Sequence, residues 1–114
     1  MRIAVVDPDK KALHNEIKCV KDVFLGCEVV MFVEPGAAQK YLEDNAVDVL
    51  LTQVPMLHMS GIQLGRRLRE VQPGAKLVYM ADDDTYCRQA LEEQTDGYLV
   101  KPVTAEGIRQ LGLR

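Results

Sequence analysis

The stretch IAVVDPDKKALHNEIKCVKDVFLGCEVVMFV, residues 3–33, decides how this chain folds. It opens with a short apolar run, Ile3 to Val6, and closes with another, Val29 to Val33, and both are rich in β-branched residues. Between the runs, four apolar residues recur at helical spacing: Leu13, Ile17, Val20 and Phe24. Gly26 follows them and can end the helix that they predict. A strand, a helix and a second strand in this order form a right-handed crossover, the unit of a parallel sheet.

The same alternation continues along the rest of the chain. Three further apolar runs lie at Val47 to Leu51, Leu77 to Met80 and Tyr98 to Val100. Runs that are apolar throughout are typical of parallel strands with helices on both faces. Four more helices are predicted. Pro35-Gly36 and the apolar residues after it indicate one, and Leu64, Leu68 and Val71 indicate the next. The stretch Thr85 to Gln94 indicates the fourth helix of the chain, and Thr104 can cap the last one. We therefore predict an α/β domain with an open, doubly wound, five-stranded parallel sheet and five helices.

Length and composition narrow the class of protein. With 114 residues, of which 47% are hydrophobic and 27% charged, we expect a single folded domain over residues 1–114. The net charge of -3 argues against direct nucleic-acid binding by this segment. No apolar stretch approaches the ~20 residues that cross a bilayer, so we expect no membrane contact and a cytoplasmic location. Three cysteines without CxxC spacing predict small core-filling residues rather than a metal site: Cys19, Cys27 and Cys87.

The residues that follow the predicted strands are the candidates for function. In open parallel sheets, ligands bind beyond the carboxyl ends of the strands. In this chain we expect those ends to bring eight residues into one pocket: Asp7, Pro8, Asp9, Gln53, Met80, Ala81, Lys101 and Pro102.

The stretch DGYLVKPVTAE, residues 96–106, resembles the last strand and helix of response regulator receiver domains, in particular those of LytTR-type transcriptional regulators. Asp48 to Leu51, followed by Met59-Ser60-Gly61, is similar to the third strand and the next loop of that family. The resemblance covers the whole chain. It implies a flavodoxin-like, CheY-like three-layer sandwich with strand order 2-1-3-4-5, and a role in two-component phosphorelay signal transduction and transcription regulation.

The resemblance also implies a pocket that departs from the family's pattern. In receivers, an aspartate at the end of the third strand accepts phosphate, two acids after the first strand help to hold magnesium, and a Ser or Thr ends the fourth strand. Here the resemblance puts Gln53 at the phosphoacceptor position, Asp7 and Pro8 at the acid pair, and Met80 at the hydroxyl position. Two positions match the family, the lysine and the switch aromatic: Lys101 and Tyr98.

These departures predict a pseudo-receiver with a degenerate phosphorylation pocket. The amide of Gln53 is neither a carboxylate nucleophile nor an anionic metal ligand. Magnesium prefers carboxylate oxygens, for which Asp7 and Asp9 are weak candidates. The run Asp82 to Asp84 could form an acidic metal site at this edge, but it is interpreted as a solvated loop before a helix. We therefore expect no phosphoryl transfer, no enzymatic turnover, no cofactor, and weak or absent magnesium binding.

Several residues of the pocket allow more than one interpretation. Asp7 is interpreted as the cap of the first helix, with Pro8 at the first helical position. Lys101 is predicted to form an ion pair with Asp7, and the bond to Pro102 is expected to be cis from the resemblance. Gln53 either accepts a hydrogen bond from Lys101 or is only a polar residue at the loop mouth. Two further side chains are interpreted as static packing residues: Met80 and Tyr98.

A protein partner is the expected ligand. The resemblance points to the face formed by the fourth helix, fifth strand and fifth helix, which would contact a second copy, an output domain or a regulatory protein. Candidate contacts on that face are Arg88, Gln89, Glu92, Tyr98 and Arg109. The basic residues of the third helix are interpreted as a solvated face: Arg66, Arg67 and Arg69.

Two other functions compete with this interpretation. The first is a phosphorylatable receiver that uses magnesium and a non-standard acid, namely Asp7, Asp9 or one of Asp82 to Asp84. An acceptor must lie in line with the phosphorus, a geometry that capping and loop acids rarely meet. The second is a flavodoxin-like cofactor or nucleotide binder. The loop after the first strand has no glycine-rich phosphate cradle, which argues against it.

Overall fold

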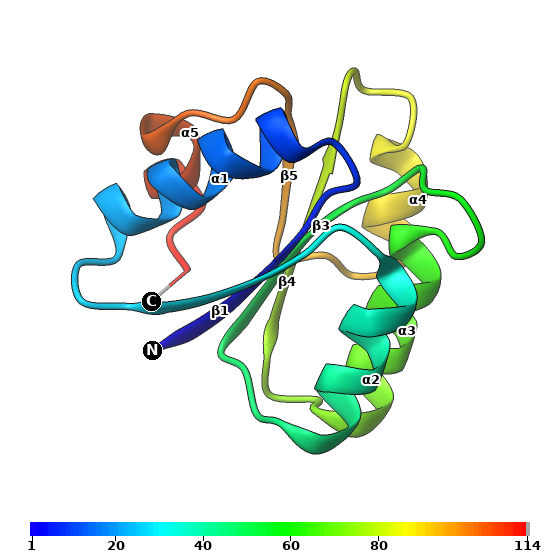
Figure 1. The fold of residues 1–114 in the computed structure, drawn as a ribbon. Coiled ribbons are helices and arrows are strands. Elements are labelled where there is room, and N and C mark those ends of the chain that lie inside the picture. The colour runs from blue at the N-terminus through cyan, green and yellow to red at the C-terminus, as the bar shows by residue number, and fades with distance from the viewer. Residues whose placement is uncertain (114) are drawn as a thin grey trace.

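The computed structural model describes residues 1–113 and alternates between strand and helix throughout (Figure 1). The elements, in chain order, are β1 (Arg2–Val6), α1 (Lys10–Val23), β2 (Glu28–Phe32), α2 (Pro35–Asp44), β3 (Val49–Gln53), α3 (Gly61–Val71), β4 (Lys76–Ala81), α4 (Cys87–Glu92), β5 (Gly97–Val100) and α5 (Ala105–Gln110). The predicted fold class is confirmed.

The five strands form one parallel sheet in the order β2-β1-β3-β4-β5. β1 lies between β2 and β3, so that Ile3 pairs with Val29 on one side and with Val49 on the other. The strand order therefore reverses next to β1. The carboxyl ends of β1 and β3 meet at the edge where open α/β sheets bind their ligands.

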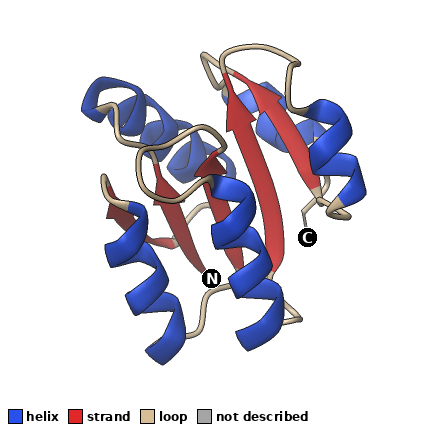
Figure 2. Ribbon diagram, turned by 90° about the vertical axis from the view of Figure 1, so that its right-hand side faces the viewer, coloured by secondary structure: helices blue, strands red, loops and turns tan. Residues whose placement is uncertain are grey.

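Helices cover both faces of the sheet, in three layers (Figures 1 and 2). α1 and α5 lie on one face, and α2, α3 and α4 lie on the other. Successive residues of a strand point to opposite faces, so each strand supplies both cores. Ile3 and Val5 pack toward α1 and α5, whereas Ala4 and Val6 pack into the core under the other three helices. This burial on both faces is the reason that the strand sequences are apolar throughout.

The helices are short. α1 is the longest, with 14 residues, and α4 and α5 have 6 residues each. α4 is therefore shorter than the predicted stretch from Thr85 to Gln94, and Cys87 and Cys27 are only half-buried, whereas Cys19 is buried as expected. No helix within residues 1–113 is long and apolar enough to cross a membrane.

The start of α1 differs from the prediction. Asp9, not Asp7, caps the helix, because its Oδ1 accepts hydrogen bonds from the backbone N–H groups of Lys11 and Ala12 at 3.0 and 3.3 Å. Pro8 lies outside the helix, between the two aspartates. The predicted cap was wrong, and the correction leaves the Asp7 carboxylate free for a different role.

Two strands end later than predicted. β3 continues to Gln53, which pairs with Met80, and β4 continues to Ala81, which pairs with Val100. Gln53 is therefore a strand residue and not part of the loop mouth. Ala81, rather than Met80, ends β4.

Gly61 allows α3 to begin directly against the end of β3. A Cβ atom at this position would collide with the backbone carbonyl of Gln53, and the Gly61 N–H donates to Val54 O at 2.7 Å. Ser60 and Gln63 close the helix start with a reciprocal capping box. The chain is thereby held firmly just beyond Gln53.

The arginines of α3 do not form a purely solvated face, as predicted, but connect neighbouring elements. Arg66 pairs with Glu93 after α4, Arg67 with Glu43 in α2, and Arg69 with Asp96 before β5. Each guanidinium reaches a carboxylate on an element that only the tertiary fold brings near. Such exposed pairs contribute about 0–1 kcal/mol each.

Candidate functional site

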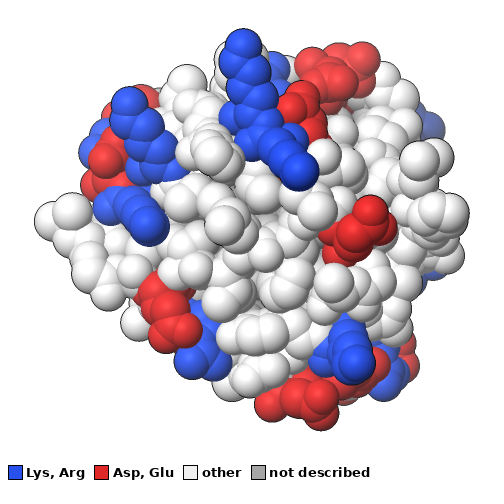
Figure 3. Space-filling view, in the orientation of Figure 1, with Lys and Arg blue, Asp and Glu red and all other residues white. Residues whose placement is uncertain are grey.

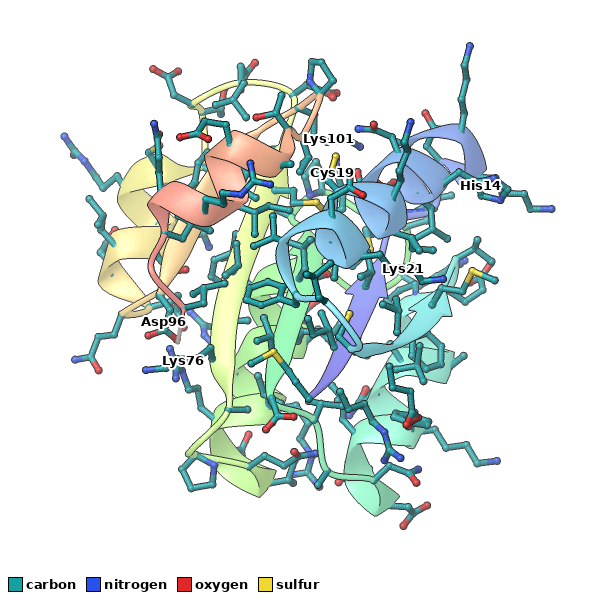
Figure 4. All side chains as sticks on the ribbon, turned by 90° about the vertical axis from the view of Figure 1, so that its left-hand side faces the viewer. His14, Cys19, Lys21, Lys76, Asp96 and Lys101 are labelled. Atoms are coloured by element: carbon teal, nitrogen blue, oxygen red, sulfur yellow. The ribbon has the colours of Figure 1, made fainter. Side chains whose placement is uncertain are left out.

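Lys101 joins the ends of three strands. Its Nζ donates to Asp7 Oδ2 after β1 at 2.7 Å and to Gln53 Oε1 at the end of β3 at 3.0 Å. Its backbone N–H donates to Ala81 O at the end of β4, at 2.8 Å. Figure 4 shows Lys101 at one end of the sheet, beside α1, and Lys76 and Asp96 at the opposite end. The predicted ion pair is confirmed, and Gln53 accepts the hydrogen bond that was one of its two interpretations.

Both carboxylate oxygens of Asp7 accept hydrogen bonds in this arrangement. It is 1% exposed, and its Oδ1 accepts the backbone N–H of Asp9 at 3.0 Å while Oδ2 accepts from Lys101. Its own N–H donates to Phe32 O in β2. Asp9 accepts hydrogen bonds from the first turn of α1, so of the two acids only Asp7 is hydrogen-bonded to Lys101, although Asp9 lines the same cavity as Glu16 and Lys101. Pro8 is exposed between them.

The β4 side of the pocket offers no hydroxyl group. Met80 is fully buried in the core beneath α1 and α5, as its interpretation as a packing residue predicted. Ala81, which ends the strand, contributes only its carbonyl oxygen. Met80 pairs with Gln53 across β3 and β4, and its match to the family's hydroxyl position stays a prediction.

Tyr98 and Pro102 flank the pocket. Tyr98 is half-buried beside the core under α2, α3 and α4, and its hydroxyl donates to the backbone carbonyl of Asp83 at 2.6 Å. Burial raises the pKa of this phenol, with a smaller opposing effect of the Tyr86 backbone. The Lys101-Pro102 bond is cis, as the resemblance predicted, and Pro102 is exposed.

Glu16 is the pocket residue that the sequence analysis missed. It lies on the buried face of α1, is 1% exposed, and its Oε2 lies 4.0 Å from Lys101 Nζ. Its carboxyl group also contacts that of Asp7, and its Oε1 has no hydrogen-bond partner. Burial first, and the neighbouring Asp7 second, raise the pKa of Glu16 from 4.5 to about 9. Glu16 is therefore a neutral carboxylic acid at neutral pH.

A sequence signal for Glu16 existed. It follows Leu13 by three residues and precedes Val20 by four, which puts it on the apolar face of α1. A glutamate at such a position is seldom fully buried without a partner. The partner, Lys101, comes from the far end of the chain.

Two contacts hold α1 against the segment after Lys101. Asn15 Nδ2 donates to Val103 O at 2.9 Å, and the Cys19 thiol lies 3.5 Å from the same oxygen. Burial raises the pKa of the Cys19 thiol. These contacts fix the distance between Glu16 and Lys101 because they join the two segments on either side of the pocket.

The donor set does not fit magnesium. Mg²⁺ is usually held by one or two carboxylates with octahedral oxygen geometry. Here the Lys101 ammonium lies between Asp7 and Gln53, and both Asp7 oxygens already accept hydrogen bonds. Within residues 1–113, no three His, Cys, Asp or Glu side chains lie together in a group that could hold a metal ion. Asp82 to Asp84 are exposed in the loop after β4.

The predicted contact face is exposed in the structure. The polar candidates on α4 and α5 lie at the surface: Arg88, Gln89, Glu92 and Arg109. Two apolar residues that the sequence analysis did not single out are also exposed on these elements, Leu91 of α4 at 72% and Val100 of β5 at 51%. The face therefore combines polar groups with exposed apolar side chains.

A doubly wound sheet in this order, with an aspartate after β1 and a lysine after β5 meeting at its carboxyl edge, defines a receiver-type signalling domain. The model of the response regulator receiver domain family matches residues 3–111. The chain belongs to that family.

Individual relatives agree with this assignment. The chain is 28% identical over 104 residues to an uncharacterised response regulatory protein of Vibrio cholerae, covering 90% of this chain and 40% of the relative. It is 24% identical to the transcriptional regulatory protein LytR of Staphylococcus aureus, covering 96% of this chain and 45% of LytR. The beryllofluoride-activated receiver domain of DrrB, from Thermotoga maritima, has a TM-score of 0.82 at 23% identity, covering 99% of this chain and 97% of that domain.

The chain spans less than half of the length of the curated relatives it matches. As a response regulator receiver domain it acts in signal transduction and is related to transcriptional regulators. Receiver domains are generally signalling modules rather than enzymes, and they interact with protein partners or output domains.

Proposed function

We propose that this domain is a pseudo-receiver that signals through protein contacts and neither accepts a phosphoryl group nor binds magnesium tightly. The observation that carries the proposal is the Lys101 ammonium, hydrogen-bonded to Asp7 at 2.7 Å and to the neutral amide of Gln53 at 3.0 Å. An amide oxygen at the end of β3 lacks the negative charge needed to attack phosphorus. The pocket also supplies its own cation.

The charges of the pocket support this proposal. Asp7 and Lys101 are opposite charges in contact, and Glu16 is held as a neutral acid by burial. The buried group is thus close to neutral without an added ion, whereas a cluster of carboxylates would need a cation to offset their repulsion.

Three of the alternative acceptors, Asp7, Asp9 and Asp83, already accept hydrogen bonds through their carboxylates. Asp7 is 1% exposed and its two oxygens already accept hydrogen bonds. Asp9 accepts two amides of α1. Asp83 accepts the Thr85 N–H at 2.9 Å in an exposed loop. A phosphorylatable receiver built on one of these acids would have to break these contacts and then align the carboxylate with phosphorus.

Incubation with acetyl phosphate and magnesium, followed by intact mass spectrometry, tests the proposal. We expect no gain of a phosphoryl group, with the DrrB receiver domain as the positive control for activation by a phosphate analogue. In parallel, amide NMR spectra should show no saturable response of Tyr98 or Lys101 to magnesium with beryllofluoride. A stable phosphoryl adduct on any aspartate would refute the proposal.

We propose that the domain contacts its output partner through the face of α4, β5 and α5. We further propose that it acts in the cytoplasm, in the control of transcription. Leu91 at 72% and Val100 at 51% exposure supply apolar contact area beside Arg88, Gln89, Glu92 and Arg109. The names of the relatives LytR and DegU, both transcriptional regulatory proteins, support a transcriptional output.

Sedimentation velocity at rising protein concentration tests self-association through this face. We expect Leu91→Glu to reduce dimer formation. Leu25→Glu is the matched control, because Leu25 is 87% exposed but lies in the turn after α1, outside the face. Equal effects of the two substitutions would argue against self-association through α4, β5 and α5.

A further inference from the structure

The outward side of α1 carries a row of exposed lysines. Its exposed lysines are Lys10, Lys11, Lys18 and Lys21. In the part of the chain that the structure describes, none of these lysines pairs with a carboxylate. The arginines of α3, by contrast, all reach acidic partners on other elements. Within residues 1–113, α1 therefore gathers four exposed lysines without an ion pair on one element, whereas Lys40, Lys76 and Arg88 are single exposed cations on separate elements.

The row stands out because the chain as a whole is acidic, with a net charge of -3. Two acids belong to α1, Glu16 and Asp22, and Glu16 is buried and neutral, so the exposed side of the helix is strongly positive. Figure 3 shows Lys and Arg side chains over the region of α1, with Asp and Glu side chains beside them, and Figure 1 locates this region on the side of the sheet shared with α5.

A shallow, open groove with a mixed polar and apolar lining runs beside this row. It lies between α1 and the edge strand β2, has a volume of about 480 Å³, and is lined by His14, Ile17, Lys18, Lys21, Asp22 and Met31. Ile17 is half-buried and Met31 is 59% exposed. Figure 4 shows Lys21 on the β2 side of α1 and His14 pointing away from the molecule.

The groove combines two kinds of complementarity. Ile17 and Met31 offer an apolar floor, and a methionine side chain adapts readily to the shape of what packs on it. Lys18 and Lys21 offer positive charge along one wall. A ligand that uses both must carry carboxylates and an apolar side chain together, as an acidic protein segment does. Asp22 in the groove and the net charge of the chain disfavour a uniform polyanion such as nucleic acid.

We propose that the groove between α1 and β2 binds an acidic segment of a protein partner. An apolar side chain of the segment lies against Ile17 and Met31, and its carboxylates lie beside Lys18 and Lys21. This surface is built from α1 and β2, whereas the proposed output face is built from α4, β5 and α5. The domain can therefore hold an acidic partner and its output contact at the same time, and the proposal does not depend on the chemistry of the pocket.

Amide NMR titration with synthetic peptides tests the proposal. The main probe is a peptide of glutamate and leucine, and its counterpart has lysine in place of each glutamate. Poly-glutamate and a single-stranded oligonucleotide complete the set. We expect saturable shifts of α1 and β2 amides with the acidic apolar peptide alone, weakening as salt is added because exposed charges are screened. The absence of saturable shifts, stronger binding of the lysine peptide or the oligonucleotide, or shifts confined to α4 and α5 would each overturn the proposal.

Charge-reversal variants locate the site. Lys18→Glu with Lys21→Glu should weaken binding of the acidic peptide about tenfold, because two attractions become repulsions. Lys40→Glu with Lys76→Glu is the matched control: it changes the net charge equally at exposed positions on α2 and β4, and it should change affinity by less than about twofold. Met31→Gln should weaken binding severalfold at unchanged charge. Equal effects of the two double variants would show that net charge, and not this groove, attracts the peptide.

Discussion

Replacing Glu16 by glutamine should stabilise the domain at neutral and alkaline pH. Glutamine has nearly the same shape, and its amide can still donate a hydrogen bond to Asp7, but it cannot ionise. In the parent chain, the folded state holds Glu16 as an acid, 1% exposed, while the unfolded chain releases the proton into water. Ionisation therefore lowers the free energy of the unfolded state but not that of the folded state.

The sign and size follow from the two pKa values. The pKa rises from 4.5 to about 9 on folding, so this contribution to stability is complete below pH 4.5 and is lost progressively as the pH rises toward 9. Each pH unit in that window costs about 1.4 kcal/mol. At pH 7 the penalty is on the order of 3 kcal/mol, an appreciable part of the ~5–15 kcal/mol stability of a typical domain.

Urea denaturation of the parent and of Glu16→Gln at several pH values measures the effect. We expect equal free energies of unfolding below about pH 3.5, where Glu16 is protonated in both states, and a widening advantage for the variant as the pH rises. Glu92→Gln is the matched control, because Glu92 is exposed on α4 and should change stability by less than about 0.5 kcal/mol at every pH. Parallel pH profiles for the parent and Glu16→Gln would refute the reasoning, since they would mean that Glu16 ionises alike in both states.

Three further substitutions test the packing of the site and the core. Lys101→Met should lower the free energy of unfolding at neutral pH by about 3–5 kcal/mol, measured by urea denaturation, because it leaves the Asp7 carboxylate buried without its cation. A loss below about 1 kcal/mol would mean that Asp7 takes up a proton at little cost. Tyr79→Phe should raise stability by about 1 kcal/mol, because the Tyr79 hydroxyl is buried without a hydrogen-bond partner. Burial also raises the pKa of Tyr79 to about 12. Clear destabilisation by this substitution would reveal a hydrogen bond to that hydroxyl. Gln72→Leu should cost about 2–3 kcal/mol and expose the Val47 amide to faster hydrogen exchange, because the Gln72 side chain accepts that N–H at 2.8 Å; unchanged exchange would contradict this role.

The fold was predictable because its signals are local. Apolar runs and helical spacing depend on neighbours a few residues apart, and they set the order of elements from β1 to α5 correctly. The ends of strands were less accurate. β3 reaches Gln53 and β4 reaches Ala81 because backbone pairing with the next strand continues past the last large apolar residue. The cap of α1 was misplaced by two residues because Asp7 and Asp9 are equally good caps as residue types.

The candidate site was predictable in part. Parallel topology alone brings the residues after β1, β3 and β5 to one edge, so the contacts among Asp7, Gln53 and Lys101 followed from the strand assignment and the resemblance to receivers. Glu16 was not found, because its spacing on α1 put it on the apolar face but gave no indication of what it would meet there.

The amino-acid sequence by itself determined the alternation of strands and helices, the amide at the end of β3 and the lysine after β5, because each depends on residue type and local spacing. Only the tertiary structure decided which charges meet. Lys101 and Asp7 are 94 positions apart in the chain, and the arginines of α3 find acids on three other elements. Such distances are set by how the helices pack on the sheet, and packing depends on all the layers at once. The same packing buries Glu16 beside Asp7 and, within residues 1–113, leaves the exposed lysines of α1 without an ion-pair partner.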